Sequence, residues 1–257
     1  MKISINCPSY KRPKVKTLKY LPYCKVWVEE AEADAYRKAN KGADINILGC
    51  KQGNVSRVRN YILDHEFSNG ADVVCIVDDD LSGIYHFTKA KHNNFGYEKC
   101  KVEAGEFDAF IYKHTIIARD LGAYLWGVNL NYDARNLKHS CPINTKGIIL
   151  GPFSCHLKGG EIRYDERLPL KEDYDLALQH LSKYRKILRL NKYHYRCKQS
   201  EQAGGCAAYR NYESEKAQFE LLQRKWGKSI VRLDKTSKKN NYKIDYNPII
   251  QVPIKGV

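Results

Sequence analysis

The spacing of apolar residues in the first third of the chain predicts strands that alternate with helices. Three short segments, "KISINC" (2–7), "KVWVEE" (25–30) and "INILGC" (45–50), are typical of strands. "ADVVCIV" (71–77) is a continuous apolar run, which is the pattern of a strand buried on both faces. Helical patterns lie between these segments, so we expect an α/β fold with a mainly parallel sheet.

Two of the gaps between these strands carry helical patterns. "AEADAYRKAN" (31–40) predicts a helix that ends before Gly42. In "NVSRVRNYILDHEF" (54–67), Val55, Val58 and Ile62 recur at helical spacing. Asn54 is a suitable N-cap for this second helix.

The pattern continues with fewer strands in the second half. "FDAFIYKHTIIARDLGAYLWGVN" (107–129) predicts a long helix that runs into a strand. "KGIILGPFSCHLKGGEIRYDERLPL" (146–170) is interpreted as a β-hairpin around a Lys-Gly-Gly turn at 158–160. Residues 171–186 begin with acids and end with bases, as a helix dipole favours, and a strand is expected at 187–191.

Together the elements predict a Rossmann-like sheet flanked by helices, with a β-hairpin and a basic C-terminal elaboration. No Pro/Gly/Ser-rich linker interrupts the chain. This favours a single domain with elaborations, in which residues 1–210 are expected to be the main part. Residues 211–257 are expected to supply a basic helix, over about 213–227, and a polar tail that is loosely ordered from 235 onward. This part should pack on the main domain or extend from it.

Composition excludes several classes of protein. A hydrophobic content of 43% with 11% aromatic residues argues against a disordered chain. No apolar run approaches the ~18 residues of a membrane span, and the first residues resemble a strand more than a secretory signal. The nine cysteines form no CxxC pair, which favours free thiols in a reducing cytoplasm over a structural zinc site.

The net charge of +15 indicates an anionic partner but says little about the fold. Most of the excess lies between residues 183 and 243, where 17 Lys and Arg face 5 Asp and Glu, a balance of +12. Nucleic acid, an anionic membrane surface and anionic small molecules are candidate partners. A basic surface that is merely solvated remains an alternative.

Three adjacent carboxylates, Asp78, Asp79 and Asp80, directly follow the buried strand at 71–77. Open α/β sheets bind ligands at the carboxyl ends of their strands. If the segment is extended, Asp78 and Asp80 share one face and Asp79 turns away. The triplet has three interpretations: a helix N-cap cluster, Mg²⁺ or Mn²⁺ ligands of a nuclease or phosphotransferase, or ligands of a metal that holds the diphosphate of a nucleotide-sugar.

Four segments in order make the chain resemble the GT-A family of glycosyltransferases over roughly residues 3–210. They are "CPSYKRP" (7–13), "QGNVSRVRNYIL" (52–63), "VDDDL" (77–81) and "YDERLPLKEDYDL" (164–176). The first resembles the loop that wraps the nucleotide base, and the third resembles the Asp-x-Asp motif. The resemblance implies a GT-A fold and a UDP-sugar as donor.

The same resemblance implies roles for individual residues. It places the donor against the following residues: Pro8, Ser9, Tyr10, Arg12, Asn54, Arg59, Asn60, Asp78 and Asp79. It implies Mn²⁺ or Mg²⁺ held by Asp80 and Asp78, with His194 as the nearest fit for a third ligand. A histidine between two tyrosines on a strand is more often a packed residue. Gly204 and Gly205 would allow close approach of the backbone to the donor, or form an ordinary loop.

Sugar transfer also needs a base that removes the proton of the acceptor hydroxyl. By resemblance to inverting members of the family, Asp173 is the first candidate and Glu172 the second. A single base opposite the leaving group implies inversion at the anomeric carbon. The alternative is that the two residues are an ordinary acidic first turn of a helix.

Within the GT-A family, "DDDLSGIYHF" (78–87) and the later "EDYDLALQHL" and "GGC" are similar to the TET-associated glycosyltransferases of phages and bacteria. Members of that group are thought to place sugars on hydroxymethylated pyrimidines in DNA. The resemblance implies 5-hydroxymethylcytosine as acceptor, and a host cytoplasm if the gene belongs to a phage. Basic residues of the last third are the candidate DNA contacts: Lys183, Arg185, Lys186, Arg196 and Arg210.

Other functions stay open at this stage. A glycosyltransferase for protein or small molecules would use the same donor site without binding DNA. A nucleic-acid-binding module with a degenerate donor pocket would bind DNA without turnover. A membrane-surface enzyme lacks a clear amphipathic helix with an aromatic face, and a nuclease is supported by the acidic triplet alone. Tyrosines among the basic residues, including Tyr193, Tyr195 and Tyr209, suit base stacking, although core packing is the commoner role of any one.

Overall fold

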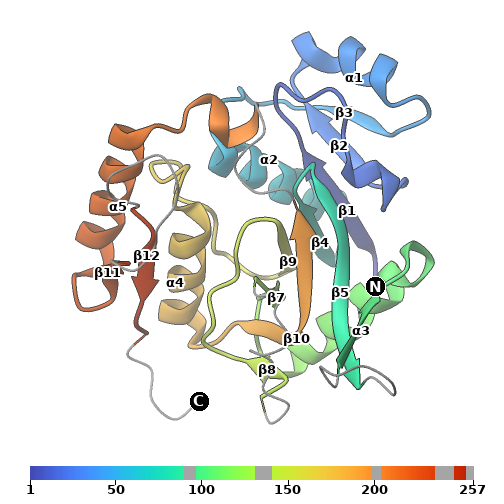
Figure 1. The fold of residues 1–257 in the computed structure, drawn as a ribbon. Coiled ribbons are helices and arrows are strands. Elements are labelled where there is room, and N and C mark those ends of the chain that lie inside the picture. Colours follow the sequence, from blue (N-terminus) through green and yellow to red (C-terminus); the bar gives the residue numbers. More distant parts are fainter. Residues whose placement is uncertain (90–96, 131–140, 198–203, 235–245, 253–257) are drawn as a thin grey trace.

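The computed structural model describes residues 1–89, 97–130, 141–197, 204–234 and 246–252. Within them one ten-stranded sheet has the order β3-β2-β1-β4-β9-β7-β10-β5-β6, with β8 paired to β10 (Figure 1). Its strands are β1 (Ile3–Pro8), β2 (Lys25–Val28), β3 (Ile45–Ile47), β4 (Val73–Val77), β5 (Leu81–Lys89), β6 (Tyr97–Lys101), β7 (Leu125–Asn129), β8 (Ile143–Asn144), β9 (Phe153–Leu157) and β10 (Leu188–Cys197).

The described sheet is mostly parallel, as the sequence predicts. Strands β1, β2, β3 and β4 pair in parallel, and so do β7 and β10. Strand β9 runs antiparallel between β4 and β7, so these two point the same way. With β6, seven of the ten strands share one direction, and only β5, β8 and β9 oppose it.

Helices cover both faces of the sheet. They are α1 (Ala33–Ala39), α2 (Val55–Ser68), α3 (Phe107–Asp120), α4 (Glu172–Tyr184) and α5 (Tyr212–Trp226). The alternation of side chains along β4 shows the two cores. Val73, Cys75 and Val77 pack in the cluster that contains α3, whereas Val74 and Ile76 pack in the cluster that contains α2 and α4. The continuous apolar run of β4 therefore reflects burial on both faces, as predicted.

The predicted hairpin at 146–170 is wrong. Strand β9 is present, but the chain after the turn at Lys158 and Gly159 forms no second strand. It lies along α2 instead, where Asn60 donates to the Tyr164 carbonyl oxygen at 2.9 Å and accepts from its N–H at 2.8 Å. Those bonds satisfy the N–H and C=O of Tyr164, two backbone groups that would otherwise need partners.

Three further strands, β5, β6 and β10, depart from the sequence prediction. Strand β10 extends to Cys197, well beyond the predicted end at residue 191. Strands β5 and β6 form an antiparallel hairpin directly after the acidic triplet, where we predicted no strand. The hairpin pairs β5 with β10, so the C-terminal half of β10 lies beside the segment that follows Asp80.

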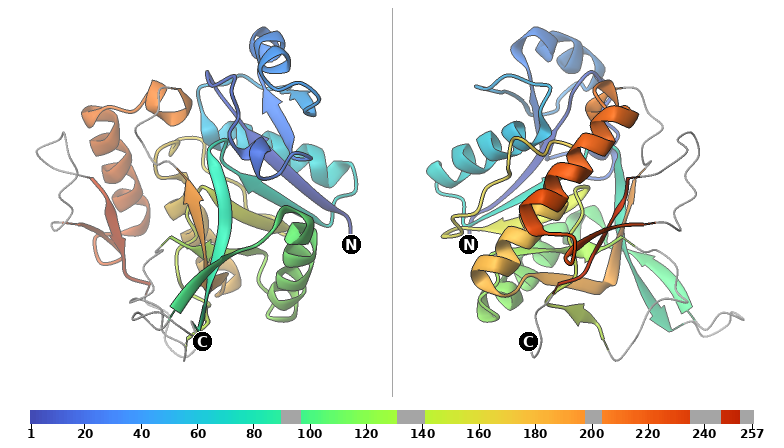
Figure 2. Two further views of the ribbon diagram at one scale, coloured as in Figure 1. Left: turned by 45° about the vertical axis from the view of Figure 1, so that its right-hand side comes forward. Right: turned by 90° about the vertical axis from the view of Figure 1, so that its left-hand side faces the viewer.

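Helix α5 and the small sheet of β11 (Val231–Leu233) and β12 (Pro248–Ile250) pack on α4 (Figure 2). Leu178 of α4 contacts a cluster with Phe219 and Leu222 of α5, while Leu181 of α4 faces the main sheet. Of the tail expected to be loosely ordered from residue 235, residues 235–245 and 253–257 lie outside the described residues.

A buried carboxylate joins α4 to α5. The side chain of Asp175 is fully buried and accepts hydrogen bonds from Lys225 at 2.9 Å, from the indole N–H of Trp226 at 2.7 Å and from Gln179 at 2.7 Å. Removing it takes away the acceptor of the Trp226 indole N–H and one of two acceptors each of Lys225, which also pairs with Asp165, and Gln179, which also bonds the Arg163 carbonyl oxygen.

We therefore expect Asp175→Ala to lower the free energy of unfolding by about 2–3 kcal/mol, as measured by urea denaturation. Asp34→Ala is the matched control, because the side chain of Asp34 is 98% exposed and its ion pair with Arg37 lies at the surface. It should leave the midpoint unchanged. An equal, small effect of both substitutions would contradict the structural role of Asp175.

Two expectations from composition can be compared with the structure. All nine cysteines are free, as predicted. Among the described residues, no helix has both the length and the apolar character that crossing a membrane requires.

Candidate active site

A cleft of about 340 Å³ opens at the carboxyl ends of β1 and β4. From β1 the chain passes to β2 on one side, and it later returns to β4 on the other side. Such a reversal of strand order leaves a crevice beside the strand ends, where open α/β folds bind their ligands. The volume falls in the range of small-molecule sites.

Most of the predicted site residues line this cleft. They are Pro8, Ser9, Tyr10, Arg12, Asn54, Arg59, Asp78, Asp79, Asp80, Glu172, Asp173, Gly205 and Arg210. Residues far apart in the sequence, from the β1 loop to the start of α5, are thus brought to one place. Sequence reasoning did not assign Gln52, Gly151, Tyr195, Cys197, Cys206 or Tyr209 to the site, although they also line it.

The acidic triplet forms a turn between β4 and β5. The N–H of Leu81 bonds the Asp78 carbonyl oxygen at 3.3 Å, and Thr17 bonds the same oxygen at 2.5 Å. A strand follows, so the interpretation as a helix N-cap cluster is wrong. The segment is not extended, so the premise for Asp78 and Asp80 sharing one face does not hold, and all three residues line the cleft.

Asp79 fixes the loop after β1. It accepts from Ser9 at 2.6 Å and from Arg12 at 2.9 Å, and Ser9 also bonds the hydroxyl of Tyr36 at 2.9 Å. Burial raises the pKa of Asp79, while the bonds from Ser9 and Arg12 oppose that rise. The segment that resembles the base-binding loop is therefore held to the acidic turn by a buried ion pair.

Arg59 of α2 connects the acidic turn to the start of α4. Its side chain is 3% exposed, and it donates to Asp78 at 3.0 Å, to Glu172 at 3.0 Å and to the carbonyl oxygen of Gly151 at 3.2 Å. Burial lowers the pKa of Arg59, but Tyr164, Asp78 and Glu172 raise it by more, so the guanidinium stays charged. A single cation thus orders two of the candidate carboxylates.

Asp80 carries the chemistry of a metal ligand. Burial and then the charges of Asp78 and Asp79 raise its pKa to about 7. A nearby cation would relieve this penalty, and carboxylate oxygens are what Mg²⁺ and Mn²⁺ prefer. Asp80 together with the partly exposed Asp78 therefore fits a divalent cation. The described residues contain no cluster of three or more His, Cys, Asp and Glu side chains that could hold a metal ion.

Glu172 and Asp173 begin α4 beside the cleft. Burial and the neighbouring Asp173 raise the pKa of Glu172 to about 8, against the opposing effect of Arg59. Burial also raises the pKa of Asp173, which accepts from the N–H groups of Gly151 at 3.1 Å and of Tyr174 at 2.8 Å. Glu172 is engaged by Arg59 and 7% exposed, whereas Asp173 is oriented by backbone groups and half-buried.

Comparison with protein families decides the class of the molecule. The model of the TET-associated glycosyltransferase family matches residues 21–205, which is most of the chain. The chain belongs to this family. It is a glycosyltransferase, as the sequence motifs predict.

Comparisons with individual proteins find only distant likenesses. No curated protein sequence matches. Among solved structures, TarS residues 1–349 from S. aureus is similar at 13% identity and a TM-score of 0.45, over 89% of this chain and 73% of that one. A second, "A197 from STIV", is similar at 10% identity and a TM-score of 0.39, over 79% of this chain and 88% of that one.

In this glycosyltransferase, Gly204 and Gly205 approach the protein's own backbone. A Cβ on Gly204 would lie 2.7 Å from the carbonyl oxygen of Lys11, and the residue has a φ of +88°. The N–H of Gly205 bonds the carbonyl oxygen of Tyr10 at 2.8 Å, and Arg12 donates to the Gly204 carbonyl at 3.0 Å. The two glycines thus let this segment dock on the loop after β1.

His194 and Asn60 of the glycosyltransferase lie outside the cleft lining. His194 is 1% exposed and stacks between the rings of Tyr85 and Phe87, at 5.8 and 4.9 Å. Burial lowers its pKa to about 4. A packed side chain was the alternative to the predicted role of His194 as a third metal ligand. The structure does not bring His194 to the aspartates of the acidic turn. Asn60 instead bonds the backbone of Tyr164 beneath the site.

The candidate DNA contacts fall into two groups. Lys183 lies in the last turn of α4, and Arg185 and Lys186 follow that helix, about 18 Å along it from Glu172 and Asp173. Arg196 is near the carboxyl end of β10, and Arg210 lines the cleft. Only the second group lies at the end of the glycosyltransferase where the cleft opens.

Proposed function

We propose that this glycosyltransferase moves a sugar from a UDP-sugar to the hydroxyl of 5-hydroxymethylcytosine in DNA, with inversion and with a divalent cation. The carrying observation is that the acidic turn and Asp173 line one cleft at the switch point of the sheet. A transferase needs both, because one neutralises the leaving diphosphate and the other receives the acceptor's proton.

The donor end of the cleft is formed by the loop after β1. Tyr10 offers a ring for stacking on the nucleotide base, and Arg12 adds a positive charge. The Asp79 ion pair pre-organises this loop before the donor arrives. Asn54 caps α2 by accepting from the N–H of Arg57 at 3.2 Å. Asn54 and Val55 line the cleft, so the N-terminus of α2 faces it. The positive end of its dipole favours an anionic donor.

The acidic turn would hold Mn²⁺ or Mg²⁺ through Asp80 and Asp78. The cation would neutralise charge that develops on the diphosphate as the sugar leaves. Arg59 keeps Asp78 in place by its ion pair at 3.0 Å.

Asp173 is the proposed base. As the acceptor oxygen forms its bond to the anomeric carbon, Asp173 takes the hydroxyl proton and the bond from that carbon to the phosphate oxygen breaks. UDP leaves with the bonding electrons, and attack from the opposite face inverts the configuration. Glu172 is less suited to this role, because its carboxyl is bonded to Arg59.

DNA is favoured as acceptor by charge and family. The net charge of +15 suits a polyanion, and Arg196 and Arg210 add cations near the cleft. The TET-associated glycosyltransferases are thought to modify hydroxymethylated pyrimidines, whose hydroxyl is exposed in the major groove or after base flipping. The free cysteines support a reducing cytoplasm as the location.

The deciding experiment is mass spectrometry of DNA that contains 5-hydroxymethylcytosine, after incubation with the protein, Mn²⁺ and a panel of sugar nucleotides. With each sugar nucleotide incubated separately, the one reaction that shifts a nucleoside mass would identify both donor and acceptor. Turnover of a UDP-sugar onto protein or a small molecule, with DNA unlabelled, would favour the alternative acceptor classes. DNA binding without turnover of any sugar nucleotide would favour a non-catalytic binding module.

The two groups of basic residues make a testable contrast. We expect Arg196→Gln with Arg210→Gln to weaken DNA binding uniformly across sequences and to reduce the salt slope of log K by about 2, one for each lost phosphate contact. Neutralising Lys183, Arg185 and Lys186 should change the affinity and the salt slope less, because these residues lie at the other end of α4. Fluorescence anisotropy over a salt series measures both. The reverse order would mean that DNA binds away from the cleft.

A further inference from the structure

Strand β10 carries a buried hydroxyl that the proposed mechanism does not use. Tyr195 is 4% exposed, and its hydroxyl has no hydrogen-bond partner among the described residues. Buried hydroxyls in folded proteins are nearly always bonded, so an unpaired one needs an explanation. A ligand that binds next to it is one such explanation.

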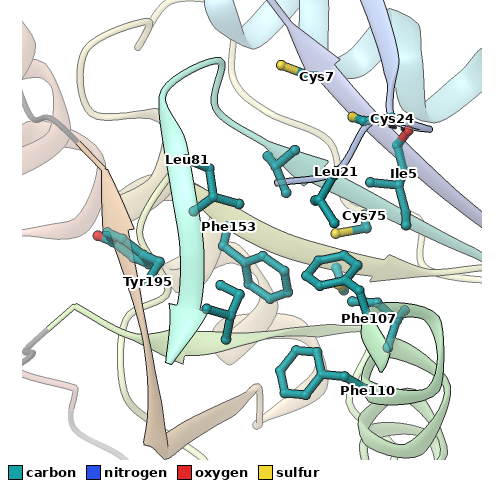
Figure 3. Close-up of a cluster of buried hydrophobic side chains, with 14 of the residues drawn as sticks. Ile5, Cys7, Leu21, Cys24, Cys75, Leu81, Phe107, Phe110, Phe153 and Tyr195 are labelled. Atoms are coloured by element: carbon teal, nitrogen blue, oxygen red, sulfur yellow. Dashed lines mark hydrogen bonds between the residues drawn. The ribbon is translucent and has the colours of Figure 1, made fainter. Parts of the chain in front are cut away.

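The position of Tyr195 favours a ligand. Figure 3 shows its ring at the margin of the apolar cluster, with its oxygen pointing away from the labelled core side chains. Tyr195 lines the cleft. Five described side chains have a buried polar atom without a hydrogen-bond partner. Of these, Tyr195 and Arg59 line the cleft, whereas Ser56, His86 and His194 do not.

The neighbours of the hydroxyl indicate which part of the donor it would meet. Tyr195 stands opposite Ile84 of β5, the strand that begins directly after the acidic turn, and it lines the same cleft as Asp78 and Asp173. Burial raises the pKa of Tyr195 well above its ordinary value, so its hydroxyl remains a protonated donor. Asp78 belongs to the end of the cleft proposed for the diphosphate, and Asp173 to the end proposed for the acceptor. The part of a UDP-sugar that lies between those two ends is the sugar itself.

We propose that Tyr195 donates a hydrogen bond to an oxygen of the transferred sugar and thereby discriminates between sugar donors. The inference rests on the proposed function and deepens it. Donors without an oxygen at that place would leave the hydroxyl buried and unpaired, which is how a polar site rejects an incomplete substrate.

Tyr195→Phe removes this hydroxyl and keeps the ring that packs in the core. The probes are UDP and the tightest binder among UDP-glucose, UDP-galactose and UDP-N-acetylglucosamine, measured by calorimetry with Mn²⁺. We expect UDP affinity to stay within about twofold, UDP-sugar affinity to fall about tenfold and kcat/KM for transfer to fall about 10- to 100-fold. Sugar nucleotides that lack one sugar oxygen each identify the partner of the hydroxyl. We expect wild type and variant to bind one of these analogues with equal affinity, namely the analogue without the oxygen that Tyr195 contacts.

Tyr193→Phe is the matched control. It lies on the same strand, outside the cleft lining, and its ring packs on Phe110 and His114 at 5.0 and 5.1 Å. It should leave all affinities unchanged.

Each outcome decides a different point. Unchanged UDP-sugar affinity and transfer in Tyr195→Phe would overturn the inference alone, since the wild type would still transfer sugar. Equal losses for UDP and UDP-sugar would also overturn it, because they would indicate a contact with the diphosphate or a structural role. A wild type that binds none of the UDP-sugars would remove the proposed function and this inference together.

Discussion

Replacing Asp173 by Asn is expected to lower kcat about 1,000-fold while the Kd for the donor changes by less than about twofold. The amide is close in size to the carboxylate, and its oxygen can still accept from the N–H of Gly151. It cannot take a proton from the acceptor hydroxyl at neutral pH. The loss should therefore appear in the chemical step, which single-turnover transfer at saturating donor measures.

The neighbouring carboxyl supplies the comparison. Glu172→Gln keeps an oxygen that can accept from Arg59, and we expect it to retain at least about a tenth of the activity. In the wild type, transfer should fall as the pH is lowered, because the ionised carboxylate is the active form. The fall should begin at a higher pH than for an ordinary aspartate, since burial raises the pKa of Asp173. The opposite ranking of the two variants would assign the base to Glu172.

The sequence predicts those parts of the site that follow directly from a buried strand. Val73–Val77 is apolar on both faces, so its end could be located, and the acids that follow it had to lie at the edge of the sheet. The start of α4 could also be predicted, because its acidic residues precede an amphipathic helix. The first pattern placed the triplet at the edge of the sheet, whereas only the family resemblance assigned Glu172 and Asp173 to the site, because acids are common in the first turn of any helix.

Contacts between distant segments explain what the sequence did not predict. The Lys-Gly-Gly turn suggested a hairpin, but Tyr164 bonds Asn60 of α2, 104 residues earlier, in place of a second strand. The side chain of Tyr195 meets the cleft only because β10 lies beside β5, which begins at the acidic turn. No pattern within the ten residues around Asn60 or Tyr195 encodes such pairings, because they depend on which elements the fold brings together.

The acidic triplet shows the same division. Its composition indicated a cation, but the different role of each aspartate depends on its partners elsewhere in the chain. Asp79 is bound to Arg12 and Ser9, and Asp78 shares Arg59 with Glu172. The raised pKa of Asp80 reflects burial beside two other negative charges. Three chemically identical residues therefore have three different environments.

We expect Asp80→Asn to abolish the stimulation of donor binding by Mn²⁺, raising the Kd for UDP at saturating Mn²⁺ about 100-fold. The substitution keeps the size of the side chain and removes the charge that would hold the cation. It also removes one of three clustered negative charges, so the protein should remain folded. Calorimetric titration with UDP, in Mn²⁺ and in EDTA, measures the two affinities.

Asp79→Asn separates the role of the cation from the role of the loop. Its bonds to Ser9 and Arg12 hold the loop after β1, so its loss should weaken UDP binding by the same factor in Mn²⁺ and in EDTA. If Asp80→Asn behaved in that way, or kept its response to Mn²⁺, Asp80 would not be a metal ligand. The cation would then have to be held by other groups, and charge on the diphosphate would be offset mainly by Arg12 and Arg59.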